Sequence, residues 1–169
     1  ADESARVLDS VRYSDEAELA AAQEWLELGV RLPSADEVGA ARKLLANTPK
    51  QGQLTDQPLV YARETVILSE TFPRIERVPV QALRIGDTGL VGFSGEPFVE
   101  LGLELRRKSA FRQHFLIGLS NHHVGYVPTV EAHELGGYEA WRAKTSYLEK
   151  DAAPKVVAAA LRRLAAIAT

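Results

Sequence analysis

The stretch that decides the fold is residues 77–93, RVPVQALRIGDTGLVGF. Its first part, 77–85, alternates loosely between apolar and polar side chains and predicts a strand. The segment Gly86-Asp87-Thr88-Gly89 predicts a turn, and the apolar run 90–93 predicts a second, more buried strand. The stretch therefore predicts a β-hairpin near 77–93.

Helical patterns precede and follow this hairpin. Ser34 and Glu37 have the spacing of a capping box at the start of a helix, and Pro97 suits the first turn of another. The segment 59–70 mixes helix-favouring and strand-favouring residues, and we predict a helix there. The expected elements are a lead-in over 1–13, helices over 15–28, 34–47 and 59–70 with a polar connection over 50–57, a helix over 97–108, a strand near 115–119, irregular site loops over 120–150, and a C-terminal helix from Pro154. The fold class is therefore α/β or α+β, in a single unit over 1–169.

Composition limits the classes of function. The 169 residues are 46% hydrophobic and 25% charged, which is typical of a globular domain, and no apolar run is long enough to span a bilayer. The formal net charge of −3 argues against a nucleic-acid binder. Because the chain has no Cys, any metal ligands must be His, carboxylates, Tyr or carbonyl oxygens.

The first candidate site residues lie in GFSGEP, residues 92–97, between a predicted strand and a predicted helix. This is the setting of a nucleophile elbow, G-x-S-x-G, but Glu96 stands where the second Gly is required. We therefore predict that Ser94 caps the helix rather than acting as a nucleophile. Glu96 is placed either to face a cleft or to complement the helix dipole.

Two further segments carry polar and aromatic side chains. In 120–129, SNHHVGYVPT, a His could bind metal or form ordinary polar contacts. Tyr126 would ionise and bind a metal if it lay buried near a positive charge; otherwise its ring packs and its hydroxyl forms hydrogen bonds. In 133–139, HELGGYE, the second His of H-E-x-x-H is missing, which excludes a zincin motif. Tyr138 follows a Gly-Gly turn and either supports an oxyanion or simply packs.

Taken together, five motifs resemble the neutral/alkaline, non-lysosomal ceramidase family in their order and spacing. They are Leu83-Arg84-Ile85-Gly86-Asp87, Gly95-Glu96-Pro97-Phe98, Gly118-Leu119-Ser120-Asn121, Gly125-Tyr126-Val127-Pro128-Thr129 and Gly136-Gly137-Tyr138-Glu139. The resemblance covers about residues 75–165. It implies a zinc-dependent amidase that cleaves N-acylsphingosine to sphingosine and fatty acid.

The resemblance also implies roles for individual residues. Glu96 and Tyr126 correspond to zinc ligands, and Tyr138 to a tyrosine that assists at the scissile amide. Asn121, His123 and Thr129 are expected to support the site or the substrate. His123 stands where the better-known ceramidases have Tyr, which leaves open a smaller substrate than a sphingolipid.

Part of the expected zinc site is missing from this chain. The family's other two zinc ligands are upstream histidines, whereas the first His here is His114. We therefore expect the chain to be the C-terminal portion of a larger catalytic domain, inactive by itself, with zinc completed by residues outside it. The substrate would be a lipid or a small N-acyl amide, and an exported or membrane-peripheral location is possible by resemblance.

Three alternatives remain at this stage. One is a related metal-dependent amidase or esterase that acts on a smaller substrate. Another is a non-catalytic interaction module on the same scaffold. The third is a serine hydrolase that uses Ser94.

Overall fold

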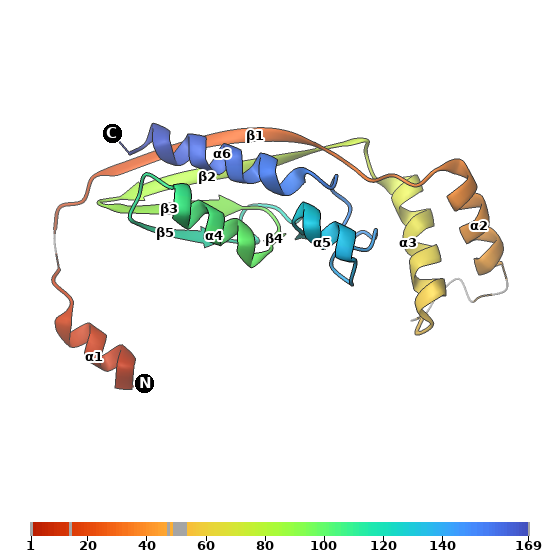
Figure 1. Ribbon diagram of the computed structural model, residues 1–169, viewed down its shortest axis with the longest axis horizontal. Helices are drawn as coiled ribbons and strands as arrows, with labels where there is room; N and C mark the ends of the chain where they lie inside the picture. Colours follow the sequence, from red (N-terminus) through yellow and green to blue (C-terminus); the bar gives the residue numbers. More distant parts are fainter. Residues whose placement is uncertain (1, 14, 47, 49–53, 169) are drawn as a thin grey trace.

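The computed structural model describes residues 2–13, 15–46, 48 and 54–168, and its architecture is mixed α/β (Figure 1). The elements in chain order are α1 (Asp2–Ser10), β1 (Leu19–Gly29), α2 (Ala35–Leu45), α3 (Gln57–Thr71), β2 (Ile75–Ile85), β3 (Thr88–Phe93), β4 (Glu96–Pro97), α4 (Val99–Lys108), β5 (Gln113–Ile117), β6 (Tyr126–Val127), α5 (Val130–Leu135) and α6 (Ala152–Ala166). The fold class expected from the sequence is confirmed.

The main sheet has four strands in the order β1-β2-β3-β5. The predicted hairpin is confirmed: β2 pairs antiparallel with β3, and Gly86 has a φ of +57° in the turn between them. The strand expected near 115–119 is also present, two residues earlier, as β5, which lies parallel to β3. A second sheet consists of the short strands β4 and β6.

The helix predicted over 15–28 is wrong, because most of this segment forms β1. Its alanines, glutamates and leucines favour a helix locally. In the structure, however, β1 pairs antiparallel with β2 from Leu19 opposite Ile85 to Gly29 opposite Ile75. Alternate side chains of β1, including Ala22 and Leu26, pack against the core. The pairing with a neighbouring strand therefore outweighs the local helix propensity.

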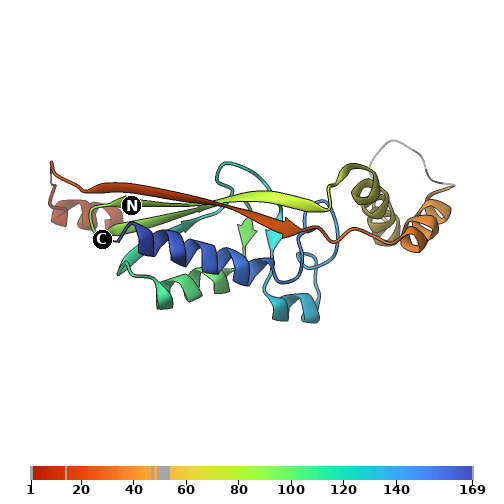
Figure 2. The ribbon, with the colours of Figure 1, turned by 90° about the horizontal axis from the view of Figure 1, so that it is seen from above.

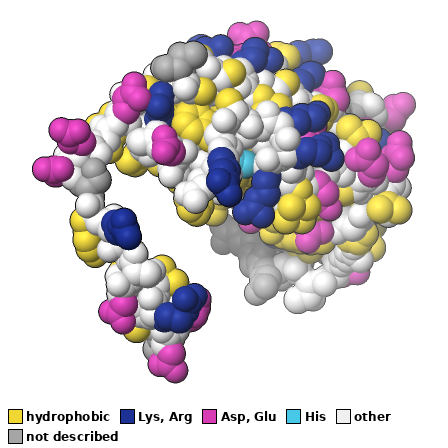
Figure 3. Space-filling view, turned by 60° about the vertical axis from the view of Figure 1, so that its left-hand side comes forward, with side chains coloured by type: hydrophobic (Ala, Val, Ile, Leu, Met, Phe, Trp, Pro, Cys, Tyr) yellow, Lys and Arg dark blue, Asp and Glu magenta, His cyan; other side chains and the backbone are white. Residues whose placement is uncertain are grey.

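The other helical predictions are largely confirmed. Ser34 and Glu37 form the expected capping box at the start of α2, and α3 covers the ambiguous segment 59–70. Residue 47 and residues 50–53, in the expected helix end and polar connection, lie outside the described part. The lead-in forms the helix α1, which has no buried residue and projects from the body (Figures 1 and 3). Figure 3 also shows basic and acidic side chains mixed across the visible face.

The core lies on one face of the main sheet, where α4 and α6 both pack (Figure 2). Its members include Leu28, Val78, Val80, Val91, Phe93, Leu101, Leu105, Val157, Ala160 and Leu164. The C-terminal helix predicted from Pro154 is confirmed and begins two residues earlier, at Ala152. Among the described elements, no helix is long and apolar enough to cross a bilayer.

The start of the helix predicted over 97–108 needs a correction. The helix begins at Val99 with Phe98 as its N-cap residue, and Pro97 belongs to β4. Ser94 therefore does not cap it. The short strand β4 pairs with β6 and leads directly into α4. The candidate site lies at the pairing of β4 with β6.

Candidate functional site

The candidate site is built on the two-residue parallel pairing of β4 with β6. Glu96 lies opposite Tyr126, and Pro97 lies opposite Val127. The backbone N–H of Glu96 donates to the Gly125 carbonyl at 2.9 Å, and the N–H of Tyr126 donates to the Thr145 carbonyl at 2.8 Å. Two residues that are 30 positions apart in the sequence are thus held side by side by main-chain hydrogen bonds.

Glycines make this close approach possible. A Cβ at Gly125 would lie 2.2 Å from the Thr145 carbonyl oxygen, and Gly125 also has a φ of +71°. A Cβ at Gly95 would lie 2.8 Å from the Gly125 carbonyl oxygen. The glycine that precedes each candidate ligand is therefore required by the packing of β4 against β6 and the 145–146 segment.

Tyr138 and His123 join this pair from the neighbouring loops. The Tyr126 and Tyr138 rings meet edge to face, with centroids 5.8 Å apart. The His123 Nε2 lies 3.5 Å from the Glu96 Oε1. The Tyr138 side chain is 57% exposed, so an external molecule can reach it. The structure therefore brings together four of the six residues selected from the sequence.

The electrostatic environment of Tyr126 is negative. The Glu96 carboxylate is the main cause of a raised Tyr126 pKa, and burial, Tyr138 and Glu139 contribute to the same shift. Ionisation of Tyr126 would be favoured by a nearby positive charge, whereas the charged side chains that shift its pKa in the structure are carboxylates. The phenol is consequently harder to ionise than usual, and an added cation beside Glu96 and Tyr126 would reverse this effect.

The other two selected residues have contacts elsewhere. The Asn121 backbone has a φ of +66°, and its Nδ2 donates to the Gln81 Oε1 at 2.7 Å. The Thr129 hydroxyl caps α5 by accepting from the Ala132 N–H at 3.1 Å. Asn121 therefore anchors the site loop to β2, and Thr129 stabilises the start of a helix.

The Ser94 side chain lies in the protein interior, where its contacts are structural rather than catalytic. It is fully buried, and its hydroxyl donates to the Pro79 carbonyl at 3.4 Å. Among the described residues, the histidines that contact a carboxylate are His122, beside Glu76, and His123, beside Glu96. This arrangement gives no support to the serine-hydrolase alternative, because a nucleophile needs an accessible hydroxyl beside a base.

Arg31 is an important site-supporting residue that sequence reasoning missed. Its guanidinium donates to the carbonyls of Leu148, Ala140 and Ser146 at 2.7–2.9 Å and to the Ser146 hydroxyl at 3.0 Å. Burial, with a smaller effect of Arg142, lowers the Arg31 pKa to about 10. This arginine fixes the 140–148 segment against which β6 is held. Nothing in the local sequence marks it, because its acceptors are more than 100 residues away.

The donors available for a metal are the Glu96 carboxylate, the Tyr126 phenol and the His123 imidazole. Within residues 2–168, leaving aside the undescribed positions, no group of three or more His, Cys, Asp or Glu side chains has the arrangement of a metal site. Of these three side chains, the carboxylate and the imidazole are of the types that usually bind zinc.

Comparisons with known proteins give a similarity of fold. No protein-family model matches the sequence, and no curated protein sequence matches it significantly. The structure is similar to the neutral ceramidase from Pseudomonas aeruginosa, with 20% sequence identity and a TM-score of 0.56, over 89% of this chain and 28% of that chain. It is also similar to a ceramidase complexed with C2, with 17% identity and a TM-score of 0.54, over 88% of this chain and 30% of that chain.

The chain thus spans less than a third of the length of either ceramidase. At these sequence identities the similarity concerns the fold alone. We conclude that the protein has a ceramidase-like fold.

Proposed function

We propose that this chain supplies part of a zinc-dependent site that hydrolyses an N-acyl amide bond. Glu96 and Tyr126 would bind the metal, and Tyr138 would act at the scissile amide. The observation that carries the proposal is the register of β4 and β6, which sets Glu96 opposite Tyr126, with the Tyr138 ring against Tyr126. The motif order in the sequence and the ceramidase-like fold support the same conclusion.

The charges around Tyr126 support a cation at this position. The carboxylates of Glu96 and Glu139 both raise the Tyr126 pKa, and no basic side chain is among the causes of that shift. A catalytic zinc needs about three protein ligands. Glu96 and Tyr126 provide two oxygens, and we propose that histidines outside this chain complete the set. When bound, zinc would supply a Lewis acid and a water of lowered pKa.

The chain's own residues would bind and orient the substrate. The Tyr138 hydroxyl would donate a hydrogen bond to the amide oxygen as negative charge develops there. His123, 3.5 Å from Glu96, would hold the carboxylate in position. Asn121 and Thr129 would act one step further away, by fixing the loop and helix that flank the site.

We propose a substrate with a long acyl or alkyl chain, of the N-acylsphingosine type, because the structural neighbours are ceramidases. A smaller N-acyl amide is the second candidate, and His123 is the observation that favours it, since the resemblance placed a tyrosine there. A non-catalytic module on this scaffold would bind neither zinc nor an amide at this site. The chain would require the remainder of a ceramidase-like domain for turnover.

Zinc binding tests the proposal in a preparation that contains the missing ligands as well as this chain. Isothermal titration calorimetry with Zn²⁺ should then give one site, and Glu96→Gln and Tyr126→Phe should each abolish it. Glu139→Gln is the matched control, because it removes a nearby carboxylate that we do not assign to the metal. Unchanged zinc affinity in Glu96→Gln would contradict the ligand assignment.

Turnover separates the candidate substrates. A fluorescent N-acylsphingosine and a series of short N-acyl amides should be compared in a preparation that contains the missing ligands as well as this chain. Preferential hydrolysis of the long-chain amide supports the ceramidase-like function, whereas preference for the short amides supports the second candidate. Tyr138→Phe should lower kcat while leaving zinc bound.

A further inference from the structure

A groove with a volume of about 400 Å³ lies on the main sheet, apart from Glu96, His123, Tyr126 and Tyr138. This volume is within the range of roughly 300–1,000 Å³ that is usual for small-molecule sites. The residues that line the groove come from β1, from β2 and from the loop after β5: Gln23, Trp25, Pro79, Gln81, Asn121 and His122. The groove therefore shares no residue with that group of four.

The alternation of side chains along β1 places Gln23 and Trp25 on the sheet face opposite to α4 and α6. Ala22, which lies between Gln23 and the preceding outward residue, packs against the core on the other face. On the neighbouring strand, Gln81 lies opposite Gln23 and Pro79 lies opposite Trp25. Strand pairing thus brings an indole ring beside a pair of amides.

Trp25 supplies a flat apolar surface that is held in place. The guanidinium carbon of Arg77 lies 5.3 Å from the centre of the Trp25 ring, in a cation–π contact. The Trp25 side chain is nonetheless 52% exposed, so an external molecule can reach it. A ligand of this groove should therefore present a flat surface that packs against an aromatic ring.

Three side-chain amides are linked in series along the groove. The Gln81 Nε2 donates to the Gln23 Oε1 at 2.7 Å, and the Asn121 Nδ2 donates to the Gln81 Oε1 at 2.7 Å. An amide group can form up to four hydrogen bonds, and in this series Gln23 and Asn121 each use one. The other N–H groups and oxygen lone pairs suit hydroxyl groups, because a hydroxyl group both donates and accepts.

The groove favours an uncharged ligand. Among the described residues, its lining has no carboxylate, ammonium or guanidinium group. Arg77 contacts the Trp25 ring but does not line the groove. The His122 imidazole, which does line it, has its Nε2 3.5 Å from the Glu76 Oε1. A charged ligand would therefore lose its hydration here without meeting an opposite charge.

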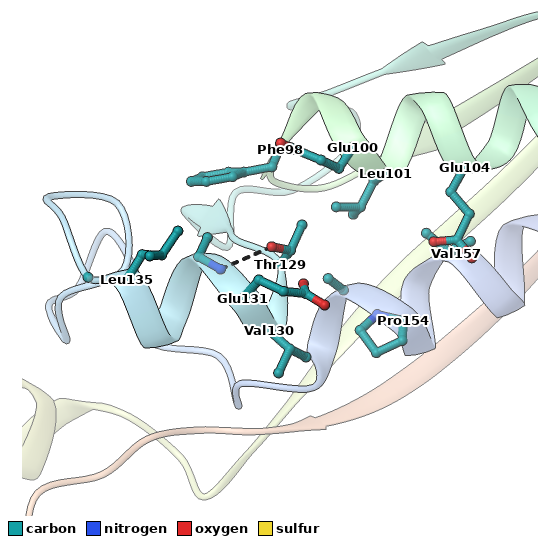
Figure 4. Close-up of a pocket in the computed structure, with 13 residues that line it drawn as sticks. Phe98, Glu100, Leu101, Glu104, Thr129, Val130, Glu131, Leu135, Pro154 and Val157 are labelled. Atoms are coloured by element: carbon teal, nitrogen blue, oxygen red, sulfur yellow. Dashed lines mark hydrogen bonds between the residues drawn. The ribbon is translucent and has the colours of Figure 1, made fainter.

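A larger cleft of about 640 Å³, between α4, α5 and the start of α6, has different chemistry (Figure 4). Its charged side chains are the carboxylates of Glu100, Glu104 and Glu131. The hydroxyl of Thr129 already accepts a hydrogen bond from the Ala132 N–H, drawn as a dashed line in Figure 4. No amide side chain lines that cleft among the described residues.

We propose that the groove on the sheet binds a neutral pyranose sugar, with one face of the sugar ring stacked on Trp25 and its hydroxyl groups hydrogen-bonded to the amides of Gln23 and Asn121. A pyranose with equatorial hydroxyl groups, such as β-glucopyranose, presents C–H groups on its faces and hydroxyl groups around its edge. The C–H groups suit the negative face of an indole ring. Sugar binding goes beyond the proposed hydrolysis, since it uses none of the residues assigned to zinc or to the scissile amide.

Tryptophan fluorescence tests the proposal directly, because the chain has two tryptophans, Trp25 and Trp141. Trp141→Phe leaves Trp25 as the reporter, whereas Trp25→Phe leaves Trp141, whose ring lies against Tyr61. The probe is methyl β-D-glucopyranoside, titrated into each variant of the intact chain. We expect a saturable shift of the emission to shorter wavelength in Trp141→Phe and no shift in Trp25→Phe.

Two small molecules separate the ring from the hydroxyl groups of the sugar. Sorbitol carries the hydroxyl groups without the ring, and cyclohexanol carries a ring with one hydroxyl group. Each should bind to Trp141→Phe at least about tenfold more weakly than the glucoside does. Absence of a saturable shift with the glucoside, or equal binding of sorbitol or cyclohexanol, would overturn the proposal.

A pair of glutamine variants tests the amides. In the Trp141→Phe background, Gln23→Ala should weaken glucoside binding by roughly fivefold, the loss expected for one hydrogen bond. Gln113→Ala is the matched control, because it removes an exposed glutamine of β5 that lies outside the groove. Circular dichroism checks that each variant is folded. Unchanged affinity in Gln23→Ala would show that the groove does not recognise hydroxyl groups as proposed.

The glucosyl group could belong to a free saccharide or to a lipid headgroup. Sedimentation of the chain with phosphatidylcholine vesicles, with and without a glucosyl diacylglycerol, distinguishes the two sources. Cosedimentation that requires both the glucosyl lipid and Trp25 would support a lipid headgroup. A fluorescence response to the glucoside without cosedimentation would support a free saccharide.

Discussion

The Glu96 carboxylate raises the pKa of the Tyr126 phenol across the β4–β6 pairing. Replacing Glu96 with Gln removes the largest cause of this shift, so the Tyr126 pKa should fall toward its ordinary value. The measurement is an NMR titration of the tyrosine Cζ signals in protein labelled with ¹³C-tyrosine. Glu139→Gln should lower the same pKa by less, because Glu139 contributes least to it. A Tyr126 pKa that is equal in the parent and in Glu96→Gln would show that the two groups do not interact as described.

Gly125→Ala should destabilise the protein by about 3 kcal/mol, from a combination of a left-handed backbone and steric overlap. The reason is the 2.2 Å separation between a Cβ at this position and the Thr145 carbonyl oxygen. Gly39→Ala in α2 is the control, because among the described residues no atom outside the neighbouring residues and the adjacent turns of its own helix lies within 4 Å of its Cβ position. That substitution should stabilise the helix by up to about 1 kcal/mol. Urea unfolding followed by circular dichroism measures both, and equal stabilities of the two variants would contradict the packing described at β6.

Arg31→Met should lower the free energy of unfolding by about 3 kcal/mol, because buried carbonyl oxygens would lose their donor. Those acceptors belong to Leu148, Ala140 and Ser146. Arg42→Met is the control: its ion pair with Glu70 is exposed and should contribute less than about 1 kcal/mol. Thermal and urea unfolding of both variants provide the comparison. A loss in Arg31→Met no greater than in Arg42→Met would rule out a supporting role for Arg31.

Glu37 should make stability depend on pH in acid. Hydrogen bonds from Arg142 and from the Ser34 backbone lower the Glu37 pKa to about 2, from an ordinary value of 4.5. Because the pKa is lower in the folded chain, the stabilisation is fully present above pH 4.5 and is lost as the pH falls toward 2. At pH 6, Glu37→Gln should cost about 1 kcal/mol, including its share of the capping box.

Urea unfolding of the parent and of Glu37→Gln across this pH range checks the prediction. The difference between the two proteins should be constant above pH 5 or so and should shrink in stronger acid. Asp36→Asn, which changes an adjacent exposed carboxylate, is the control. A difference that grows on acidification would have the wrong sign for a lowered pKa.

The sequence predicted the elements whose signals are local. The hairpin of β2 and β3 has a turn and alternating side chains, and α2 has a complete capping box, so both were found. The segment that forms β1 was assigned to a helix, because its composition favours one and its strand partner begins 46 residues after β1 ends. A pairing between strands so far apart in the sequence produces no recognisable pattern within a short window of residues.

The same distinction applies to the site. Gly95-Glu96 and Gly125-Tyr126 have recognisable spacing, and the structure places them side by side. The contact between Tyr126 and Tyr138 and the hydrogen bonds of Arg31 depend on how the loops fold back, and single-sequence reasoning cannot supply that geometry. The roles of these residues in zinc binding and catalysis remain predictions.

The helices α2 and α3 lie between β1 and β2 in the sequence, and these two strands nonetheless pair along their full length. The same two helices also contact the segment that follows Tyr138. The contacts are Arg142 with Glu37, the Lys144 N–H with Glu64, and the Trp141 ring with Tyr61. Sequence change in this pair can therefore reposition the tyrosine loop while every motif residue stays the same. Relatives with intact motifs but divergent α2–α3 segments should differ in which molecules their sites accept, and such divergence offers a route to new specificity while Glu96 and Tyr126 stay unchanged.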